Sequence, residues 1–157
     1  MPKSVYIETT IVSYLTAPPS PNLVQRAHQR LTRKWWRTRR SDFELYVSPL
    51  VLQEAAGGHT TRARRRVAAL QGIAVLGPTP EAVRLGAALV AQGPIPKKAG
   101  VDAMHIAIAT VHGIDYLLTW NCTHIANAAM RSQIESTCRT VGYEPPVLCT
   151  PEELMED

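Results

Sequence analysis

The spacing of hydrophobic and polar residues changes several times along the 157-residue chain, from alternation to helical periodicity and back. Short runs that alternate, or that are rich in β-branched residues, predict strands at Ser4–Ile7, Leu45–Val47, Ile73–Leu76, Asp115–Thr119 and Pro146–Cys149. Helical spacing between these runs predicts helices at Ile11–Leu15, Asn22–Arg40, Pro49–Ala56, Thr60–Leu70, Pro80–Ala91, Ala103–Val111 and His124–Val141. Because strands alternate with helices, we predict an α/β fold, a three-layer α/β/α sandwich with a mainly parallel sheet of about five strands. The length favours a single domain over residues 1–157.

Capping residues mark where several helices begin. Thr9 or Thr10 is the expected N-cap of the first predicted helix. Ser48, followed by Pro49, gives an N-cap and an N1 proline for the third. Near the C-terminus, the segment from Thr150 to Glu153 matches a capping box and predicts a short tail helix.

The long helix predicted at Asn22–Arg40 has apolar residues four positions apart. We expect these residues to form its buried stripe: Leu23, Ala27, Leu31 and Trp35. Trp36 has a less obvious role in the core, and one interpretation is an exposed surface for a protein partner.

The segment Ala103–Val111 is almost entirely apolar, which predicts a helix buried in the middle of the fold. Asp102 stands at its start, either as an N-cap or as a functional carboxylate. We expect His105 to be a partly buried hydrogen-bonding residue beside Asp102. The spacing of the histidines and Cys122 here matches no common zinc pattern. His124 is interpreted as capping its helix or contacting phosphate.

Composition narrows the class of protein. No apolar run approaches the roughly 20 residues that a membrane-spanning helix needs. The N-terminal segment MPKSVYIETT lacks the apolar core of a signal peptide, so we expect a cytoplasmic protein with no membrane partner. The 3 cysteines are odd in number and lack paired spacing. They therefore favour reduced thiols over a disulfide framework or a zinc ribbon.

Positive charge is concentrated, although the formal net charge is only +4. Most of the 17 Lys and Arg residues lie in two segments, residues 26–40 and 62–66, which indicates a polyanionic partner. Arg33 and Arg37 share a helix with two tryptophans, so RNA binding through charge and stacking is one interpretation and a solvated basic face is the other. Lys97 and Lys98 precede Asp102 in a loop, where they are better placed to guide phosphates.

Three acidic residues and one amide stand at positions that a parallel sheet brings to one edge. Glu8 directly follows the first predicted strand, and Asn121 follows the fourth at the corresponding place. Glu54 shares the inward face of the helix after the second strand, and Asp102 begins the buried helix. Ligand sites in such sheets lie beyond the carboxyl ends of the strands. We therefore expect these four side chains to converge.

Each of these residues also has a structural interpretation, as an N-cap, as the partner of an arginine or as a turn residue. The combination favours a metal site, because carboxylates gathered at one edge repel each other unless a cation neutralises them. Oxygen ligands without a requirement for cysteine or histidine select a hard ion, Mg²⁺ or Mn²⁺. Such an ion orients and acidifies a water and screens a phosphodiester oxygen during in-line attack.

At these positions the sequence resembles the PIN-domain nucleases, most closely the VapC-like toxins of type II toxin–antitoxin systems, along essentially the whole chain. Four segments carry the resemblance: VYIETT, VSPLVLQEAAGG, VDAMHIAIA, which is the most specific, and LLTWNCTHIAN. It implies a PIN-like fold and a divalent-metal-dependent endoribonuclease. By position, Glu8, Glu54 and Asp102 match metal ligands, Asn121 stands in the fourth acidic place, and Thr119 matches a small hydroxyl contact near it. Glu8 replaces the usual Asp, and the neutral Asn121 leaves the cluster one negative charge short.

The resemblance also implies partners: an RNA substrate, an acidic or amphipathic antitoxin bound near the N-terminal helical hairpin, and a second copy of the chain in a homodimer. Two other functions stay open. Glu8 and Asn121 suggest a catalytically weak PIN module that binds RNA or a protein without cleavage. A metal-dependent phosphatase or DNA nuclease would use the same site.

Overall fold

An all-parallel sheet forms the middle layer of the structure, a computed structural model that describes residues 1–156. Within these residues the sheet has five strands: β1 (Lys3–Ile7), β2 (Phe43–Val47), β3 (Ala74–Val75), β4 (Tyr116–Leu118) and β5 (Val147–Cys149). The helices are α1 (Thr9–Thr16), α2 (Leu23–Thr38), α3 (Pro49–Ala55), α4 (Thr60–Ala69), α5 (Pro80–Ala91), α6 (Gly100–Val111) and α7 (Ala128–Val141). Short 3₁₀ turns, η1 (Arg40–Asp42) and η2 (Lys97–Ala99), precede β2 and α6.

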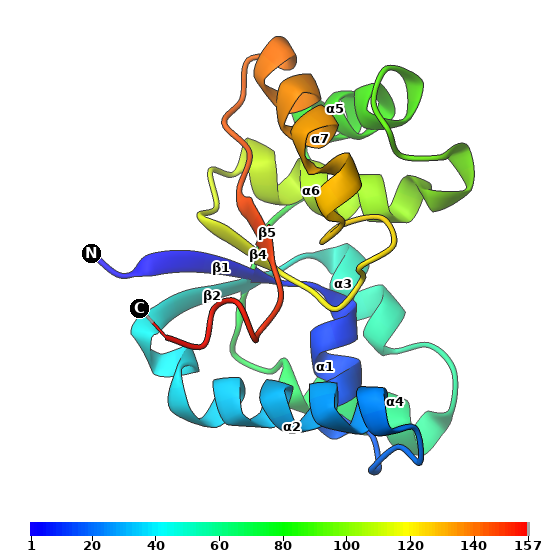
Figure 1. The fold of residues 1–157 in the computed structure, drawn as a ribbon, viewed down its shortest axis with the longest axis vertical. Coiled ribbons are helices and arrows are strands. Elements are labelled where there is room, and N and C mark those ends of the chain that lie inside the picture. Colours follow the sequence, from blue (N-terminus) through cyan, green and yellow to red (C-terminus); the bar gives the residue numbers. More distant parts are fainter. Residues whose placement is uncertain (157) are drawn as a thin grey trace.

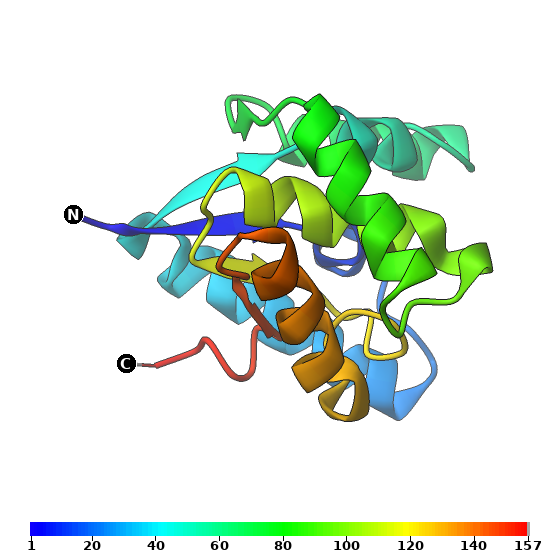
Figure 2. The same cartoon turned by 90° about the horizontal axis from the view of Figure 1, so that it is seen from above.

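Helices cover both faces of the sheet (Figure 1). On one face α1, α2 and α4 lie together, with α1 packed against the other two. On the other face α5 packs along α6 and also contacts α7, as the view from above shows (Figure 2). This arrangement confirms the predicted three-layer α/β/α sandwich with a parallel sheet.

The strand order is β3-β2-β1-β4-β5, so the chain starts in the middle of the sheet. It moves outward through β2 to β3 and then crosses back to β4 and β5 on the other side of β1. The order therefore reverses between β1 and β4, where Ile7 pairs with Leu118 in parallel register. The carboxyl ends of two strands at such a reversal are where open α/β sheets build ligand sites.

The central strand and α6 form the middle of the hydrophobic core. Val5, Tyr6 and Ile7 of β1 have no exposed surface. On α6, Ala103 and residues 105–110 are buried. The prediction of a buried helix from an almost entirely apolar segment is therefore confirmed, and this helix lies directly against the strand that begins the chain.

The thiols of Cys122, Cys138 and Cys149 are all free, and the last two are buried. Burial raises the pKa of the Cys149 thiol to about 12, with a further contribution from the Glu153 carboxylate, so this thiol stays protonated near neutral pH. Among the described helices, none combines the length and the apolar character needed to cross a membrane.

The buried face of α2 differs from the predicted stripe. Leu23 is 78% exposed and Ala27 is also exposed, whereas Gln29, Thr32 and Trp35 are buried. The prediction is confirmed for Trp35 and wrong for Leu23 and Ala27, because polar side chains on this face have partners. The Gln29 amide bonds to the backbone of the α1–α2 loop, and the Thr32 hydroxyl donates to a carbonyl of its own helix and accepts an indole N–H. Satisfied hydrogen bonds allow polar residues to occupy buried positions.

The indole of Trp120, in the loop after β4, joins α2 to that loop. Its Nε1 donates to Thr32 Oγ1 over 2.6 Å, and its ring stacks on the imidazole of His28 with the ring centroids 4.0 Å apart. The ring of Tyr14 on α1 lies 6.2 Å from that of Trp120 and 6.4 Å from that of His28. The backbone N–H of Trp120 donates to Thr10 Oγ1 over 2.8 Å. Helices α1 and α2 are therefore both attached to the end of β4.

Two helix predictions near the C-terminus need correction. Helix α7 begins at Ala128 rather than His124, because Asn127 is the N-cap and accepts from the backbone N–H two residues on. The backbone N–H of Thr150 donates to Glu153 Oε1 over 3.1 Å, and a backbone N–H returns to the threonine hydroxyl. This capping-box pattern closes a turn, and the predicted tail helix is absent from the described part of the chain.

The neighbouring residues Trp35 and Trp36 provide a test of the core. Trp35 is fully buried and its Nε1 donates to Leu154 O over 3.1 Å, whereas Trp36 is half-buried beneath the Arg40 guanidinium, 4.2 Å from its ring centroid. Trp35→Ala is expected to lower the free energy of unfolding by about 3–5 kcal/mol. Trp36→Ala serves as the control and should cost about 1 kcal/mol. Urea denaturation followed by circular dichroism measures both, and equal losses would contradict this assignment.

Candidate metal centre

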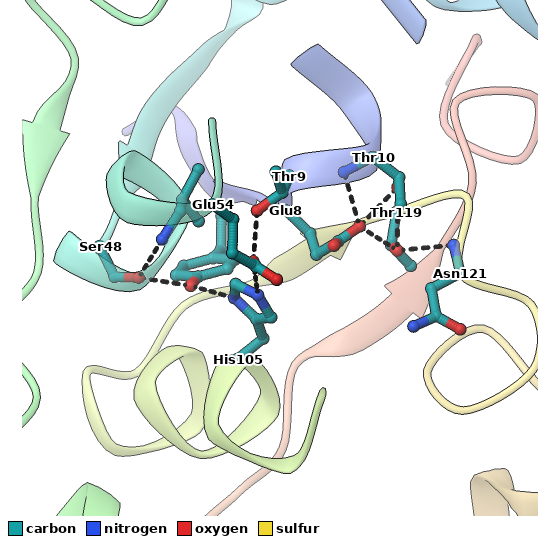
Figure 3. Close-up of polar contacts among 10 residues, drawn as sticks. Glu8, Thr9, Thr10, Ser48, Glu54, His105, Thr119 and Asn121 are labelled. Atoms are coloured by element: carbon teal, nitrogen blue, oxygen red, sulfur yellow. Dashed lines mark hydrogen bonds and ion pairs between the residues drawn. The ribbon is translucent and has the colours of Figure 1, made fainter. Parts of the chain in front are cut away.

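The carboxyl ends of β1 and β4 carry two of the residues expected in the site. Glu8 directly follows β1 and Thr119 directly follows β4. The backbone N–H of Glu8 donates to Leu118 O over 3.1 Å, so the two strand ends stay paired up to this point. Figure 3 shows Glu8 and Glu54 converging with His105, which comes from α6.

The Glu8 carboxylate is 4% exposed and acts as the N-cap of α1. Its Oε1 accepts from the backbone N–H and the hydroxyl of Thr10, and from Thr119 Oγ1 over 2.6 Å. The expectation that Thr9 or Thr10 would cap α1 was wrong, because the Glu8 side chain accepts from the backbone N–H of Thr10 in the first turn. Every described hydrogen bond to this carboxylate goes to Oε1, which leaves Oε2 for a ligand.

The two hydroxyls that donate to Glu8 are themselves oriented by backbone groups. Thr10 Oγ1 accepts from the backbone N–H of Trp120 over 2.8 Å, and Thr119 Oγ1 accepts from the backbone N–H of Asn121 over 2.9 Å. Each hydroxyl therefore has its proton directed at the Glu8 carboxylate. Hydrogen bonds to a carboxylate oxygen are stronger than neutral ones, so these threonines hold the Glu8 side chain in its orientation.

Glu54, on α3, keeps 37% of its side chain exposed. Its Oε1 accepts from Thr9 Oγ1 over 2.6 Å and contacts His105 Nε2 at 2.7 Å. Burial opposes ionisation of this carboxylate, but the hydrogen bonds from His105 and Thr9 outweigh that effect. They hold the pKa of Glu54 below its ordinary value. As in Glu8, the described hydrogen bonds use one oxygen and leave the other open.

The ligand atoms of Glu8, Glu54 and His105 all lie within 4.8 Å of one another. Among the described residues this group does not include Asp102, although Asp102 precedes His105 by one turn on the same helix. His105 is fully buried and contacts Tyr6 as well as Glu54, so the expectation of a partly buried histidine beside Asp102 was wrong.

Asp102 lies in the first turn of α6, and Ala99 rather than Asp102 is the N-cap. One oxygen of Asp102, Oδ2, is 2.9 Å from His124 Nδ1. The Oδ1 atom of Asn121 accepts from the backbone N–H of His124 over 3.0 Å. The structure thus joins these three residues in one local group, with the Asn121 side-chain oxygen already occupied by a turn.

The basic residues proposed to bind RNA differ in their surroundings. The Arg33 guanidinium donates to Leu15 O and Ala17 O at the C-terminal end of α1, so it stabilises the α1–α2 connection. Arg37 is exposed beside other basic residues of α2. Lys97 and Lys98 are exposed in η2, immediately before α6 and its Asp102.

The histidine partners of two carboxylates were missed by sequence reasoning. The signal for His105 was a lone imidazole in an otherwise apolar helix, because a buried polar group needs a partner. Nothing in the sequence indicated that this partner would be Glu54, which lies far away along the chain. The contact of His124 with Asp102 depends on how the loop after β4 folds, and no local pattern marks it.

The donor set fits a hard divalent cation. Glu8 and Glu54 each present a carboxylate with one oxygen already held by hydroxyls or an imidazole. Within residues 1–156, no Lys or Arg forms an ion pair with Glu8, Glu54 or Asp102. Oxygen donors with unbalanced negative charge are the ligands that Mg²⁺ and Mn²⁺ prefer.

Comparison with known proteins gives a match at the level of structure. No protein-family model and no curated protein matches the sequence. VapC20 of Mycobacterium tuberculosis, a toxin that cleaves the Sarcin-Ricin loop, aligns with a TM-score of 0.60 at 15% identity, covering 76% of this chain and 91% of VapC20. VapBC2 from Rickettsia felis, bound to a DNA fragment from its promoter, aligns with a TM-score of 0.53 at 13% identity, covering 75% of this chain and 88% of the matched one. The chain therefore has a PIN-domain, VapC-like fold, as the resemblance predicted.

Glu54→Gln is expected to flatten the acid side of the pH–stability profile. Because the pKa of Glu54 is lowered by folding, its ionised form stabilises the folded state. This contribution is complete above the ordinary carboxyl pKa and is lost as the pH falls through the lower value of the folded state. The free energy of unfolding should therefore fall more steeply for the wild type than for Glu54→Gln, as measured by urea denaturation from about pH 6 to about pH 3.

The matched control is Glu44→Gln, an exposed glutamate on β2. Its profile should run parallel to that of the wild type. A Glu54→Gln profile that is also parallel to the wild type would contradict the stabilising role of the Glu54 charge.

Proposed function

We propose that this chain, which has the fold of the VapC toxins, is a divalent-metal-dependent endoribonuclease that hydrolyses RNA phosphodiester bonds and acts as the toxin of a toxin–antitoxin pair. One observation carries the proposal. Glu8 and Glu54 converge at the point where the strand order reverses, each with one free oxygen and neither paired with a Lys or Arg among residues 1–156. Such a position is where parallel α/β sheets bind ligands.

In this proposal Glu8, Glu54 and Asp102 hold one or two Mg²⁺ or Mn²⁺ ions. When bound, the metal supplies Lewis acidity that polarises a phosphodiester oxygen and lowers the pKa of a water. Thr119 holds Glu8 in place through its 2.6 Å hydrogen bond to Oε1. Asn121 would complete the site through Oδ1, directly or through a water, because this oxygen has a second lone pair besides the one that accepts from the His124 backbone N–H.

Asp102 would reach the same ion with its second oxygen. Its Oδ2 is held by His124 Nδ1 at 2.9 Å, which leaves Oδ1 without a described partner. All three carboxylates thus share one arrangement, in which the protein holds one oxygen and leaves the other open. A carboxylate whose rotamer is already fixed loses less conformational entropy when it binds a ligand.

Positive charge beside the site supports a polyanionic substrate. Lys97 and Lys98 are exposed and stand directly before α6, whose first turn contains Asp102. In the proposal they contact the phosphates that flank the scissile bond. Arg37 and its basic neighbours on α2 form a second cationic surface. Arg33 instead stabilises the C-terminal end of α1 by donating to two backbone carbonyls there.

The proposed protein partner is an antitoxin with an acidic or amphipathic segment. A groove of about 360 Å³ lies between the α1–α2 connection and α4, and Arg62 and Arg66 line it. Charge complementarity favours an acidic segment there. Homodimerisation remains a prediction from the resemblance, to be measured by analytical ultracentrifugation.

Glu8→Gln and Asp102→Asn are expected to remove metal binding and RNA cleavage together. Each change replaces a charged oxygen donor by a neutral amide of the same size, and the wild type should cleave RNA with Mg²⁺ or Mn²⁺ but not with EDTA. The cleavage rate should fall by about 100-fold or more, the upper end of what is lost when even an outer-shell partner of a metal is removed. Gel-based cleavage of RNA and of DNA of the same sequence measures rate and substrate class.

Asp115→Asn is the matched control, because this carboxylate lies at the opposite end of β4, where it accepts from Ser4. It should leave cleavage unchanged. Equal cleavage by all variants, with and without EDTA, would refute the metal mechanism. RNA or protein binding without metal binding or cleavage would establish the PIN module that only binds.

Lys97→Ala combined with Lys98→Ala is expected to weaken RNA binding in a salt-dependent way. Each lost phosphate contact should reduce the slope of log affinity against log salt concentration by about 0.7 for single-stranded RNA. Fluorescence anisotropy at several salt concentrations measures this slope. Arg64→Ala combined with Arg65→Ala removes the same charge from exposed positions on α4 and should leave the slope unchanged. Equal slopes for both double variants would rule out a specific role for the lysines.

A further inference from the structure

A chain of buried side chains runs through the core to the Glu54 carboxylate. Ser48, Tyr6 and His105 are each 0% exposed. Ser48 Oγ is 2.8 Å from the Tyr6 hydroxyl, which in turn is 2.7 Å from His105 Nδ1. His105 Nε2 is 2.7 Å from Glu54 Oε1 (Figure 3). The chain begins at the N-cap of α3 and ends at the carboxylate near the other end of that helix.

Only one assignment of protons lets each proton in this series of four side chains take part in a hydrogen bond. Ser48 Oγ accepts from the backbone N–H of Val51 over 3.3 Å, so its own proton is available to the Tyr6 oxygen. The Tyr6 proton then goes to His105 Nδ1, and the imidazole donates from Nε2 to Glu54. In this assignment Nδ1 of the imidazole is an acceptor and Nε2 carries the proton that is donated to Glu54.

The Tyr6 phenol keeps its proton in this environment. Burial raises the pKa of the phenol above its ordinary value in spite of the hydrogen bond to Ser48. The charges of Glu8 and Glu54 raise that pKa further. The contacts of Tyr6 with Ser48 and His105 make the phenol a donor to His105.

Helix α3 has seven residues, too few to be stable without tertiary contacts. The Ser48–Tyr6 bond fixes its first turn to β1, and the His105 bond fixes its far end to α6. The direction of the Glu54 side chain is therefore set by two elements outside its own helix. Loss of either hydrogen bond would change the direction of Glu54 Oε2.

We propose that Tyr6 and His105 are positioning residues that hold Glu54 in the orientation in which its free oxygen takes up the divalent cation together with Glu8. This inference rests on the proposed metal-dependent function. His105 does not ligate the metal itself, because its Nδ1 accepts from Tyr6 and its Nε2 donates to Glu54. Donation from an outer imidazole to a ligating carboxylate fixes the rotamer of that carboxylate.

Tyr6→Phe tests the proposal without touching a ligand. It removes one hydroxyl, leaves His105 Nδ1 without a donor and keeps the packing of the ring. Calorimetric titration of the full chain with MnCl₂ should show binding weakened by about tenfold or more. Thr110→Val is the matched control, since Thr110 is buried on the same helix and its hydroxyl donates to Ile106 O. It should leave Mn²⁺ affinity unchanged.

A second measurement uses the metal-free protein. Nitrogen-15 chemical shifts of His105 should show a proton on Nε2 in the wild type and a mixture of the two tautomers in Tyr6→Phe. Should Tyr6→Phe fail to fold, His105→Gln and His105→Ala replace it in the titration. The Gln side chain can donate an amide N–H to Glu54. His105→Gln should therefore bind Mn²⁺ more tightly than His105→Ala.

The outcomes separate this inference from the proposed function. A wild type that does not bind Mn²⁺ overturns the proposed function, whatever the His105 shifts show. A wild type that binds, with Tyr6→Phe binding equally well, overturns the positioning role and leaves the nuclease proposal intact. Equal loss of affinity in His105→Gln and His105→Ala would identify His105 as a ligand and overturn the positioning role as well.

Discussion

The site is organised around two carboxylates that lie close together and are held by hydroxyls and an imidazole, with no Lys or Arg paired to either among residues 1–156. The ligand atoms of Glu8, Glu54 and His105 fall within 4.8 Å. Two negative charges at such distances repel each other. Short hydrogen bonds from threonines hold one oxygen of each carboxylate in place. The remaining negative charge is what a divalent cation would neutralise.

The two carboxylates need different kinds of support because they lie at opposite ends of helices. Glu8 is the N-cap of α1, where the helix dipole and the free N–H groups favour negative charge. Glu54 is near the C-terminal end of α3, where the dipole opposes it. Side-chain donors from outside the helix, Thr9 and His105, take the place of the missing backbone support. Tyr6 and Ser48 continue the support of Glu54 into the core through His105.

Much of the architecture was predictable because it depends on local patterns. Alternation between strand and helix periodicity predicted the parallel sheet and its layers, and the apolar segment Ala103–Val111 predicted the buried α6. The buried face of α2 was not predictable from apolar spacing, since Gln29 and Thr32 occupy it through hydrogen bonds to other elements.

The convergence of Glu8 and Glu54 followed from the prediction of a parallel sheet, whose strands end at one edge, whereas the strand order came from the structure. The partners of these acids did not follow, because His105 and Tyr6 meet Glu54 through contacts between residues far apart in the chain. The same holds for Asp102, whose contact with His124 arises where the loop after β4 returns to α6. A pattern can place a side chain at an edge, but the neighbour that orients it comes from the tertiary fold.

The contacts of Trp120 connect α2 to the carboxylate of Glu8. The indole binds Thr32 and stacks on His28, while its backbone N–H orients the Thr10 hydroxyl that donates to Glu8. Mechanical load applied to the outer surface of α2 would therefore pass through one aromatic side chain to the Glu8 carboxylate. A displacement of α2 would therefore shift the Thr10 hydroxyl and disturb the hydrogen bond by which it holds Glu8.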